Sequence, residues 1–161
     1  MFKLREKLKS SLGQGIVEFA LVIPLLLTIV VGIFETGRAI YIYQAVSTAS
    51  REAARLGSSA SYYLDCDAIE QVALNIGAPG NVTVADITIT YDSGPGSPSI
   101  GTCPVNEEDI ELGDRVVVQV TGYFEPAASV PLFNFPSIPF SSTTRRTIIK
   151  EADLSDPGIS P

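Results

Sequence analysis

The chain has 161 residues, of which 45% are hydrophobic, and a formal net charge of −7 with no histidine. This length accommodates one membrane segment and one domain of about 100 residues. The absence of histidine removes the commonest general base and the commonest zinc ligand, and an acidic chain lacks the basic surface that nucleic acid requires. We therefore predict that the protein is not an enzyme, binds no nucleic acid and needs no cofactor or metal ion.

The N-terminus combines a basic segment with a long apolar run. Residues 1–13 read M-F-K-L-R-E-K-L-K-S-S-L-G, with four basic side chains and one acidic one. Residues 19–34 carry no charge, and with the apolar residues just before them they approach the roughly 20 residues that cross a bilayer. We expect a single membrane pass over about residues 16–34. The basic flank marks the cytoplasmic side, which places the rest of the chain outside.

Two residues are unexpected inside this run, Glu18 and Pro24. An ionised carboxylate within a bilayer costs roughly 2.5–3.5 kcal/mol, so Glu18 needs a partner or a functional reason. If the chain is cleaved after Gly13, Gln14 becomes the new terminus and Glu18 the fifth residue, and positions four apart share a helix face. Cleavage after Gly15 is the alternative, and it leaves Glu18 third. Pro24 removes one backbone hydrogen bond and is expected to kink or loosen the helix.

These features resemble the type IV pilin class, in which a short basic leader ends in glycine and a glutamate, here followed by Phe19, is fifth after the cleavage site. More narrowly, G-x-x-x-x-E-F-A-L-V-x-P-L-L-L, then G-I-F-E-x-G-R and Q-A-V-x-x-A-S-R-E-A-A-R, resembles the TadE-like pseudopilins or minor pilins of the tight-adherence (Flp-type) pilus system. The resemblance is dense from Gly13 to about Arg55 and weak afterwards.

The resemblance implies how the N-terminus is processed and used. A prepilin peptidase would cleave between Gly13 and Gln14, and Glu18, with Phe19 beside it, would pair with the terminal amine of a subunit during assembly. The implied partners are other pilins or pseudopilins and the pilus assembly platform, in a pilus used for adherence or secretion. The implied location is the cytoplasmic membrane, with incorporation into an extracellular pilus left open.

The helix is expected to continue beyond the membrane. Apolar residues recur at spacings of three and four from Ala39 to Leu56, which predicts one helix over residues 14–57 that ends at Gly57. This stripe packs against the distal domain of the protein, against neighbouring subunits, or both. Glu35 and Arg38 lie at the outer membrane boundary, where they either pair or leave Arg38 to extend toward the headgroups.

Residues 62–153 are predicted to form an extracytoplasmic α+β domain, followed by a flexible tail at 154–161. Residues 65–76 read as an amphipathic helix with Asp65 as its N-cap. Alternating apolar residues predict strands at 86–91, 115–124 and 142–150. We therefore expect a pilin-like α+β fold in which the long helix packs against a small antiparallel sheet.

Two loops connect the predicted strands. Residues 92–101 are rich in glycine, proline and serine. Residues 125–141 contain four prolines together with Phe133, Phe135 and Phe140. This second loop is too apolar for an ordinary linker, so it either folds back over the sheet or forms a contact surface for another pilus component.

The two cysteines of the chain, Cys66 and Cys103, both fall in the predicted external domain. An even cysteine count in an exported domain predicts a disulfide, and two free buried thiols are the alternative. The acidic cluster at residues 106–114 lacks the spacing of an EF-hand loop. A solvated acidic loop is the default interpretation, and calcium binding stays open.

Two other classes of protein compete with the pilin interpretation. One is an uncleaved single-pass membrane protein with an extracytoplasmic binding domain. The other is a secreted domain released by signal peptidase, which the long apolar run and the poor cleavage site after it disfavour.

Overall fold

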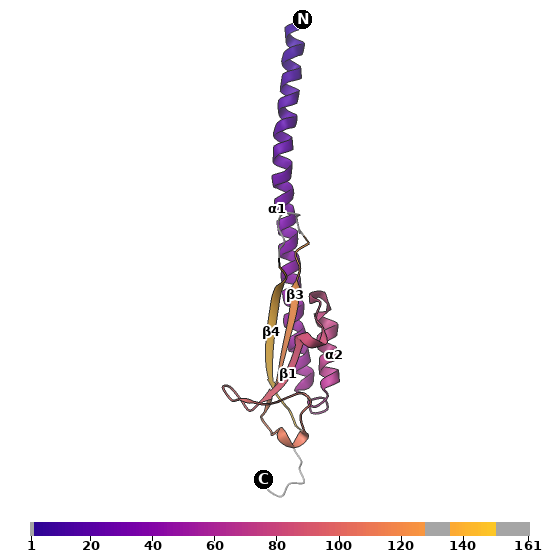
Figure 1. Cartoon of the computed structure of the whole chain (residues 1–161), viewed down its shortest axis with the longest axis vertical. Coiled ribbons are helices and arrows are strands. Elements are labelled where there is room, and N and C mark those ends of the chain that lie inside the picture. The colour runs from indigo at the N-terminus through magenta and orange to yellow at the C-terminus, as the bar shows by residue number, and fades with distance from the viewer. Residues whose placement is uncertain (1, 128–135, 151–161) are drawn as a thin grey trace.

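The computed structural model describes residues 2–127 and 136–150, with side chains from residue 13 onward. A long helical rod carries a small α+β domain on its C-terminal half (Figure 1). This arrangement confirms the predicted fold, a long N-terminal helix packed against a small antiparallel sheet. The predicted tail at 154–161 and the residues Phe133 and Phe135 of the apolar loop lie outside the described residues.

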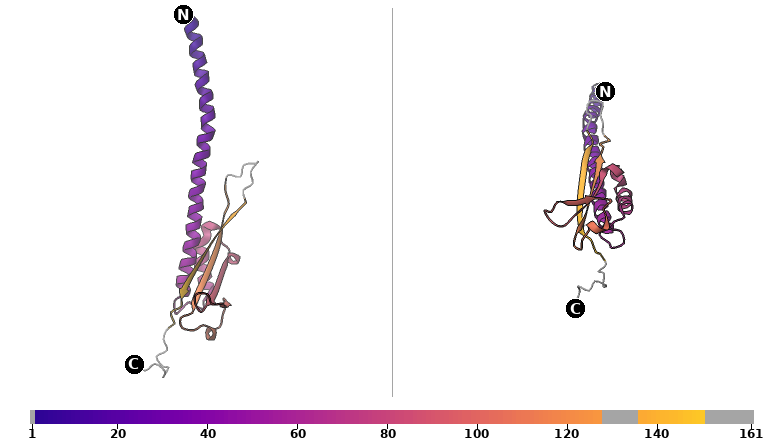
Figure 2. Two further views of the ribbon diagram at one scale, coloured as in Figure 1. Left: turned by 90° about the vertical axis from the view of Figure 1, so that its left-hand side faces the viewer. Right: turned by 60° about the horizontal axis from the view of Figure 1, so that its bottom comes forward.

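The rod is α1 (Phe2–Gly57), one α-helix that contains Pro24 and also includes residues 2–13 of the predicted leader. Figure 2 shows it as a gently bowed rod whose upper part stands clear of the rest of the chain. In the lower part, Ile42, Val46, Ala49 and Ala53 are buried against the domain. These residues belong to the apolar stripe predicted from the helical period, and the stripe does pack on the protein's own domain.

The sheet has the strand order β2-β1-β3-β4, and every neighbouring pair is antiparallel. The strands are β1 (Ile87–Asp92), β2 (Ser99–Thr102), β3 (Arg115–Phe124) and β4 (Ile138–Thr147). Val116, Val118 and Val120 on β3 are fully buried. Because side chains alternate between the two faces of a strand, these three valines place one face of the sheet against α1.

Two features of the sheet differ from the sequence prediction. β2 was expected to be part of a loop, and β4 runs from Ile138 to Thr147 rather than from Ser142 to Lys150. β2 has four residues, Ser-Ile-Gly-Thr, and so gives almost no alternating signal; its pairing with β1 is a tertiary effect. The start of β4 contains Pro139, which is tolerated because β4 is an edge strand.

The second helix, α2 (Cys66–Gly77), lies on the opposite side of α1 from β4 (Figure 1). Its N-cap is Asp65, as predicted, and the Asp65 carboxylate accepts a hydrogen bond from the backbone N–H of Ala68 at 2.9 Å. Ile69 and Ala73 are fully buried. The amphipathic pattern therefore identified the buried face of this helix correctly.

Cys66 and Cys103 form a disulfide, which confirms the predicted pair and excludes two free thiols. The bond joins the first residue of α2 to the residue that follows β2. Beside it, the hydroxyl of Tyr91 donates to the carbonyl of Tyr63 at 2.6 Å. Tyr91 is fully buried, and this burial raises its pKa to about 12.

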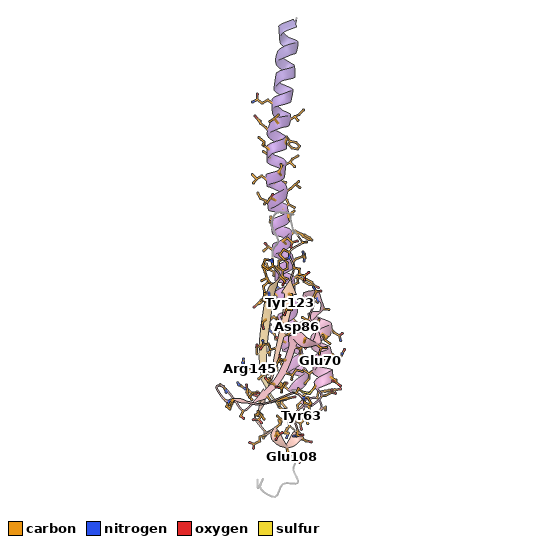
Figure 3. All side chains as sticks on the ribbon, in the orientation of Figure 1. Tyr63, Glu70, Asp86, Glu108, Tyr123 and Arg145 are labelled. Atoms are coloured by element: carbon orange, nitrogen blue, oxygen red, sulfur yellow. A yellow bond between two sulfur atoms is a disulfide. The ribbon has the colours of Figure 1, made fainter. Side chains whose placement is uncertain are left out.

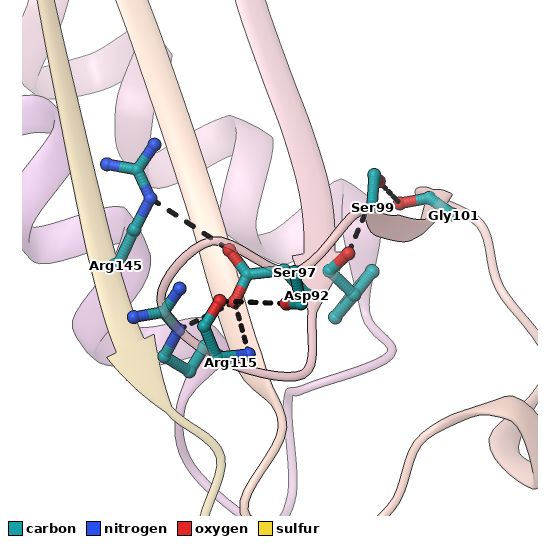
Figure 4. A network of polar contacts seen from close by, with 8 residues as sticks. Asp92, Ser97, Ser99, Gly101, Arg115 and Arg145 are labelled. Carbon is teal, nitrogen blue, oxygen red and sulfur yellow. Dashed lines mark hydrogen bonds and ion pairs between the residues drawn. The ribbon is translucent and has the colours of Figure 1, made fainter.

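A polar network at the end of β1 connects three strands (Figure 4). The Asp92 carboxylate on β1 accepts from Nε of Arg115 on β3 at 2.6 Å and from the backbone N–H of Gly94 at 3.2 Å. Arg145 on β4 reaches its second oxygen at 3.9 Å. The Arg115 hydrogen bond is the main reason why the pKa of Asp92 is lowered below its ordinary value.

Candidate functional site

The N-terminal half of α1 has no cover from the protein's own domain. Every side chain from Gly13 to Phe34 is exposed, and its most apolar 18-residue window is 0% buried. Figure 3 shows side chains radiating from this part of the rod in all directions. By length and composition the helix is able to cross a membrane. An apolar surface of this size needs a bilayer or other apolar helices around it.

Glu18 lies near the N-terminal end of this uncovered stretch. The side-chain amide of Gln14 donates to its carboxylate at 3.3 Å, one helical turn away. No salt bridge involves Glu18 among residues 13–127 and 136–150, and Phe19 beside it is exposed. The predicted pairing of Glu18 with a terminal amine requires a second subunit or a new N-terminus, so it stays a prediction.

The helix is unbroken through the predicted cleavage site and through Pro24. Gly13 and Gly15 both have open space around them, with nothing within 4 Å of the place where a Cβ would stand. The carbonyl oxygen of Pro24 accepts a hydrogen bond from the hydroxyl of Thr28 at 2.8 Å. Cleavage after Gly13 and a functional role for Pro24 remain predictions.

A polar cluster marks the place where α1 leaves the apolar run. Arg38 donates to both carboxylate oxygens of Glu35, at 2.8 and 3.0 Å, so the pairing alternative is correct. Arg38 also donates to the carbonyl of Glu125 at 2.9 Å, and its guanidinium lies 5.2 Å from the centroid of the Phe124 ring. The carboxylate of Glu35 accepts from the backbone N–H of Ala127 at 3.2 Å. We call these residues the boundary cluster; they attach the end of β3 to α1.

Sequence reasoning found only half of the boundary cluster. The spacing of Glu35 and Arg38 indicated a helical pair. The groups contributed by Glu125 and Ala127 are a backbone carbonyl and a backbone N–H, respectively 87 and 92 residues away along the chain. Backbone groups leave no signal in the residue types, so this half of the cluster could not be predicted.

The acidic residues behind Cys103 form a short 3-10 turn over Glu107–Asp109. The carboxylate of Glu107 accepts from the hydroxyl of Tyr63 at 2.9 Å, and Lys150 donates to the carbonyl of Ile110 at 2.7 Å. Within the described part of the chain, no group of three or more acidic, cysteine or histidine side chains is placed to hold a metal ion. The turn and the residue after it therefore contact Tyr63 and Lys150 at the lower end of the domain.

Comparison with known proteins finds one family. Residues 13–55 match the family model described as TadE-like protein. No curated protein and no solved structure matches the chain. The matched stretch covers the uncovered half of α1, the boundary cluster's Glu35 and Arg38, and nearly all of the half that packs on the sheet. It coincides with the stretch in which the sequence resemblance is dense, and over these residues the chain is similar to TadE-like proteins.

Proposed function

We propose that the protein is a membrane-anchored pseudopilin or minor pilin that acts in assembly of a type IV-like (Tad/Flp) pilus for adherence or secretion. The main support is the combination of a TadE-like segment with an apolar helix whose residues 13–34 are uncovered and contain one carboxylate, Glu18. A helix that only anchors a domain gains nothing from a charge that costs free energy to insert.

The proposed mechanism begins with cleavage by a prepilin peptidase. Water adds across the peptide bond between Gly13 and Gln14, which releases the basic leader and creates an amine at Gln14. This amine and the Glu18 carboxylate attract each other strongly in an apolar environment. The exposed face of α1 then packs against the helices of neighbouring subunits, with the charge pair fixing their register.

The arrangement of the rest of the molecule fits this sequence of events. The basic leader stays on the cytoplasmic side by the charge rule for membrane helices, so the α+β domain lies outside. The Cys66–Cys103 disulfide is consistent with that location, because disulfides persist in oxidising compartments. The domain covers only the lower half of α1 and leaves the upper half available for the membrane and then for partners.

The decisive experiment measures the intact mass of the membrane-extracted protein, with and without a co-expressed prepilin peptidase. We expect a peptidase-dependent loss of residues 1–13. A protein that keeps its leader under both conditions would instead be an uncleaved single-pass anchor, an alternative that the unbroken helix through Gly13 also allows. Loss of residues 1–15 would identify Gly15 as the cleavage site.

A second experiment tests the role of the charge. Glu18→Ala should allow membrane insertion and cleavage but prevent co-purification with other pilus components. The matched control is Glu52→Ala, which removes a carboxylate from the same helix outside the membrane, where it pairs with Arg55. Equal recovery of partners with both variants would contradict the proposed role of Glu18.

A further inference from the structure

We infer that one end of the sheet lies in the outer headgroup layer of the membrane, where it contacts zwitterionic phospholipid. We call this the β3–β4 end; it consists of residues 124–127 at the end of β3 and residues 136–138 at the start of β4. This inference rests on the membrane-anchoring part of the proposed function and adds a second membrane contact, made by the sheet rather than by α1. The inference follows from the position along α1, relative to the membrane, at which the boundary cluster attaches the end of β3.

The length of the apolar run sets the depth of α1 in the membrane. Residues 15–34 of α1 span about 30 Å at 1.5 Å per residue, which matches a hydrocarbon core of about 30 Å. Glu35 is then the first residue beyond the core. Each headgroup layer is roughly 5–7 Å thick, and the stretch from Glu35 to Arg38 rises about 4.5 Å. Both charged residues of the boundary cluster therefore lie within the outer headgroup layer.

The end of the sheet lies at the same level as Glu35 and Arg38. The backbone N–H of Ala127 lies 3.2 Å from the Glu35 carboxylate, and the carbonyl of Glu125 lies 2.9 Å from the Arg38 guanidinium. β4 begins beside the same end of the sheet, because Ile138 pairs with Phe124. In Figure 2 this end of the sheet is the one directed toward the N-terminal part of α1. The chain at residues 125–127 must therefore enter the headgroup layer with Glu35 and Arg38.

The β3–β4 end carries little net charge. Glu35 and Arg38 neutralise each other, and the Glu35 side chain is only 16% exposed. Pro136, Ser137 and Ile138, on the other side of the connection, are exposed and uncharged. Among the described residues at this end, 124–127 and 136–138, Glu125 is exposed and carries the remaining charge. A lone carboxylate is repelled by anionic lipid, so a zwitterionic headgroup is the chemistry that fits.

The experiment uses tryptophan fluorescence, because the chain contains no tryptophan and a single substitution gives an unambiguous probe. Ala127→Trp and Ser137→Trp place the probe on the two sides of the connection, at exposed positions. Ala127 takes part in the boundary cluster through its backbone N–H, so the substitution keeps that hydrogen bond. The full-length protein is reconstituted in phosphatidylcholine vesicles with lipid brominated at a shallow or a deep acyl position.

Two control variants complete the design. Leu27→Trp lies in the middle of the apolar run and reports on membrane insertion itself. Ile149→Trp is exposed at the far end of the domain, where its backbone N–H donates to the carbonyl of Ser58. Circular dichroism of each variant establishes that it is folded, and two independent probes at the β3–β4 end protect against the failure of either one.

We expect Ala127→Trp and Ser137→Trp to show blue-shifted emission that shallow bromolipid quenches, and Ile149→Trp to be quenched by aqueous iodide instead. If Leu27→Trp is quenched by deep bromolipid while the two β3–β4 probes respond only to iodide, the proposed headgroup contact is disproved and the insertion of α1 in the membrane is supported. If Leu27→Trp is also insensitive to bromolipid, both the membrane insertion of α1 and the headgroup contact of the β3–β4 end are disproved. If bromolipid quenches Ile149→Trp as strongly as it quenches Ala127→Trp and Ser137→Trp, the whole domain lies on the membrane. This result would also contradict a headgroup contact limited to the β3–β4 end.

Discussion

Gly122 on β3 lies so close to Val46 on α1 that a Cβ at position 122 would stand 2.5 Å from the Cγ2 atom of Val46. The same Cβ would be 3.1 Å from the carbonyl oxygen of Gly80. Val46 is almost fully buried, and its Cγ2 atom would also be 3.2 Å from a Cβ at Gly80. The close approach of the long helix to β3 at this point therefore depends on the absence of a side chain at position 122.

Gly122→Ala is expected to lower the free energy of unfolding of the domain by about 1–3 kcal/mol, the usual cost of overpacking a core. The matched control is Gly37→Ala, at a helical glycine with nothing within 4 Å, which should raise helix stability by about 0.5–1 kcal/mol. Urea unfolding of the full chain in detergent micelles, followed by the near-ultraviolet circular dichroism of tyrosine, measures both. Equal behaviour of the two variants would show that the sheet can shift away from α1.

The sequence predicts the parts of this packing that local residue patterns determine, but not the parts that depend on contacts between residues far apart in the chain. The buried stripe of α1 follows from a helical period within about 20 residues, and the Cys66–Cys103 disulfide follows because the chain has only two cysteines. The requirement for glycine at 122 does not follow, because it arises from contacts with residues 76 and 42 positions away. Alternation in β3 indicates which residues face α1 but not how closely the two elements approach.

The unpredicted strand β2 has a similar explanation. Ser99 and Gly101 are poor strand formers, and the strand exists because Gly101 pairs with Tyr91 and Thr102 with Thr90. The preceding glycines and prolines indicated a loop, and that indication is correct for residues 93–98, which lie in neither strand. The sequence-based interpretation thus failed where tertiary pairing overrides local preference.

Removal of the disulfide tests how strongly the domain depends on its one cross-link. Cys66 and Cys103 are 37 residues apart, and the chain-entropy model gives about 4 kcal/mol for closing a loop of this length. The double variant Cys66→Ser/Cys103→Ser should lose about that much unfolding free energy in the same urea assay. The wild-type protein treated with a reducing agent should show the same loss, and the double variant should not respond to the reductant. A loss well below 1 kcal/mol would mean that the domain is held by its core alone.

The Asp92 network predicts a dependence of stability on acid pH. Hydrogen bonding from Arg115 lowers the pKa of Asp92 in the folded state, so the unfolded chain binds a proton at higher pH than the folded one does. The stabilisation is therefore fully present above the unfolded pKa, near 3.8, and is lost as the pH falls through the lower folded value. Unfolding free energies measured between about pH 5 and pH 2 should decrease with falling pH.

Asp92→Asn should make that decrease smaller and should cost about 1–3 kcal/mol at neutral pH, because the half-buried Arg115 loses its charged partner. Glu108→Gln is the control, since Glu108 is an exposed carboxylate on the surface turn. This variant should retain the wild-type pH profile. If Asp92→Asn keeps the full acid decrease, the decrease must come from other carboxylates, such as Asp86, whose pKa is lowered by its hydrogen bonds with Thr83.

The boundary cluster predicts how firmly the end of β3 is attached to α1. Glu35→Ala removes the acceptor for the Ala127 N–H and the partner of Arg38. For a hydrogen bond to this mostly buried carboxylate we expect a contribution of about 1 kcal/mol, so hydrogen exchange at the Ala127 amide should become roughly fivefold faster. Glu35→Gln keeps a carbonyl acceptor and should restore part of the protection. Glu52→Ala is the control, because it breaks a comparable helical pair with Arg55 that makes no hydrogen bond to the sheet in the described residues. This variant should leave hydrogen exchange at the Ala127 amide unchanged. Equal exchange in Glu35→Ala and Glu52→Ala would show that Arg38 and Phe124 hold the end of β3 without the carboxylate.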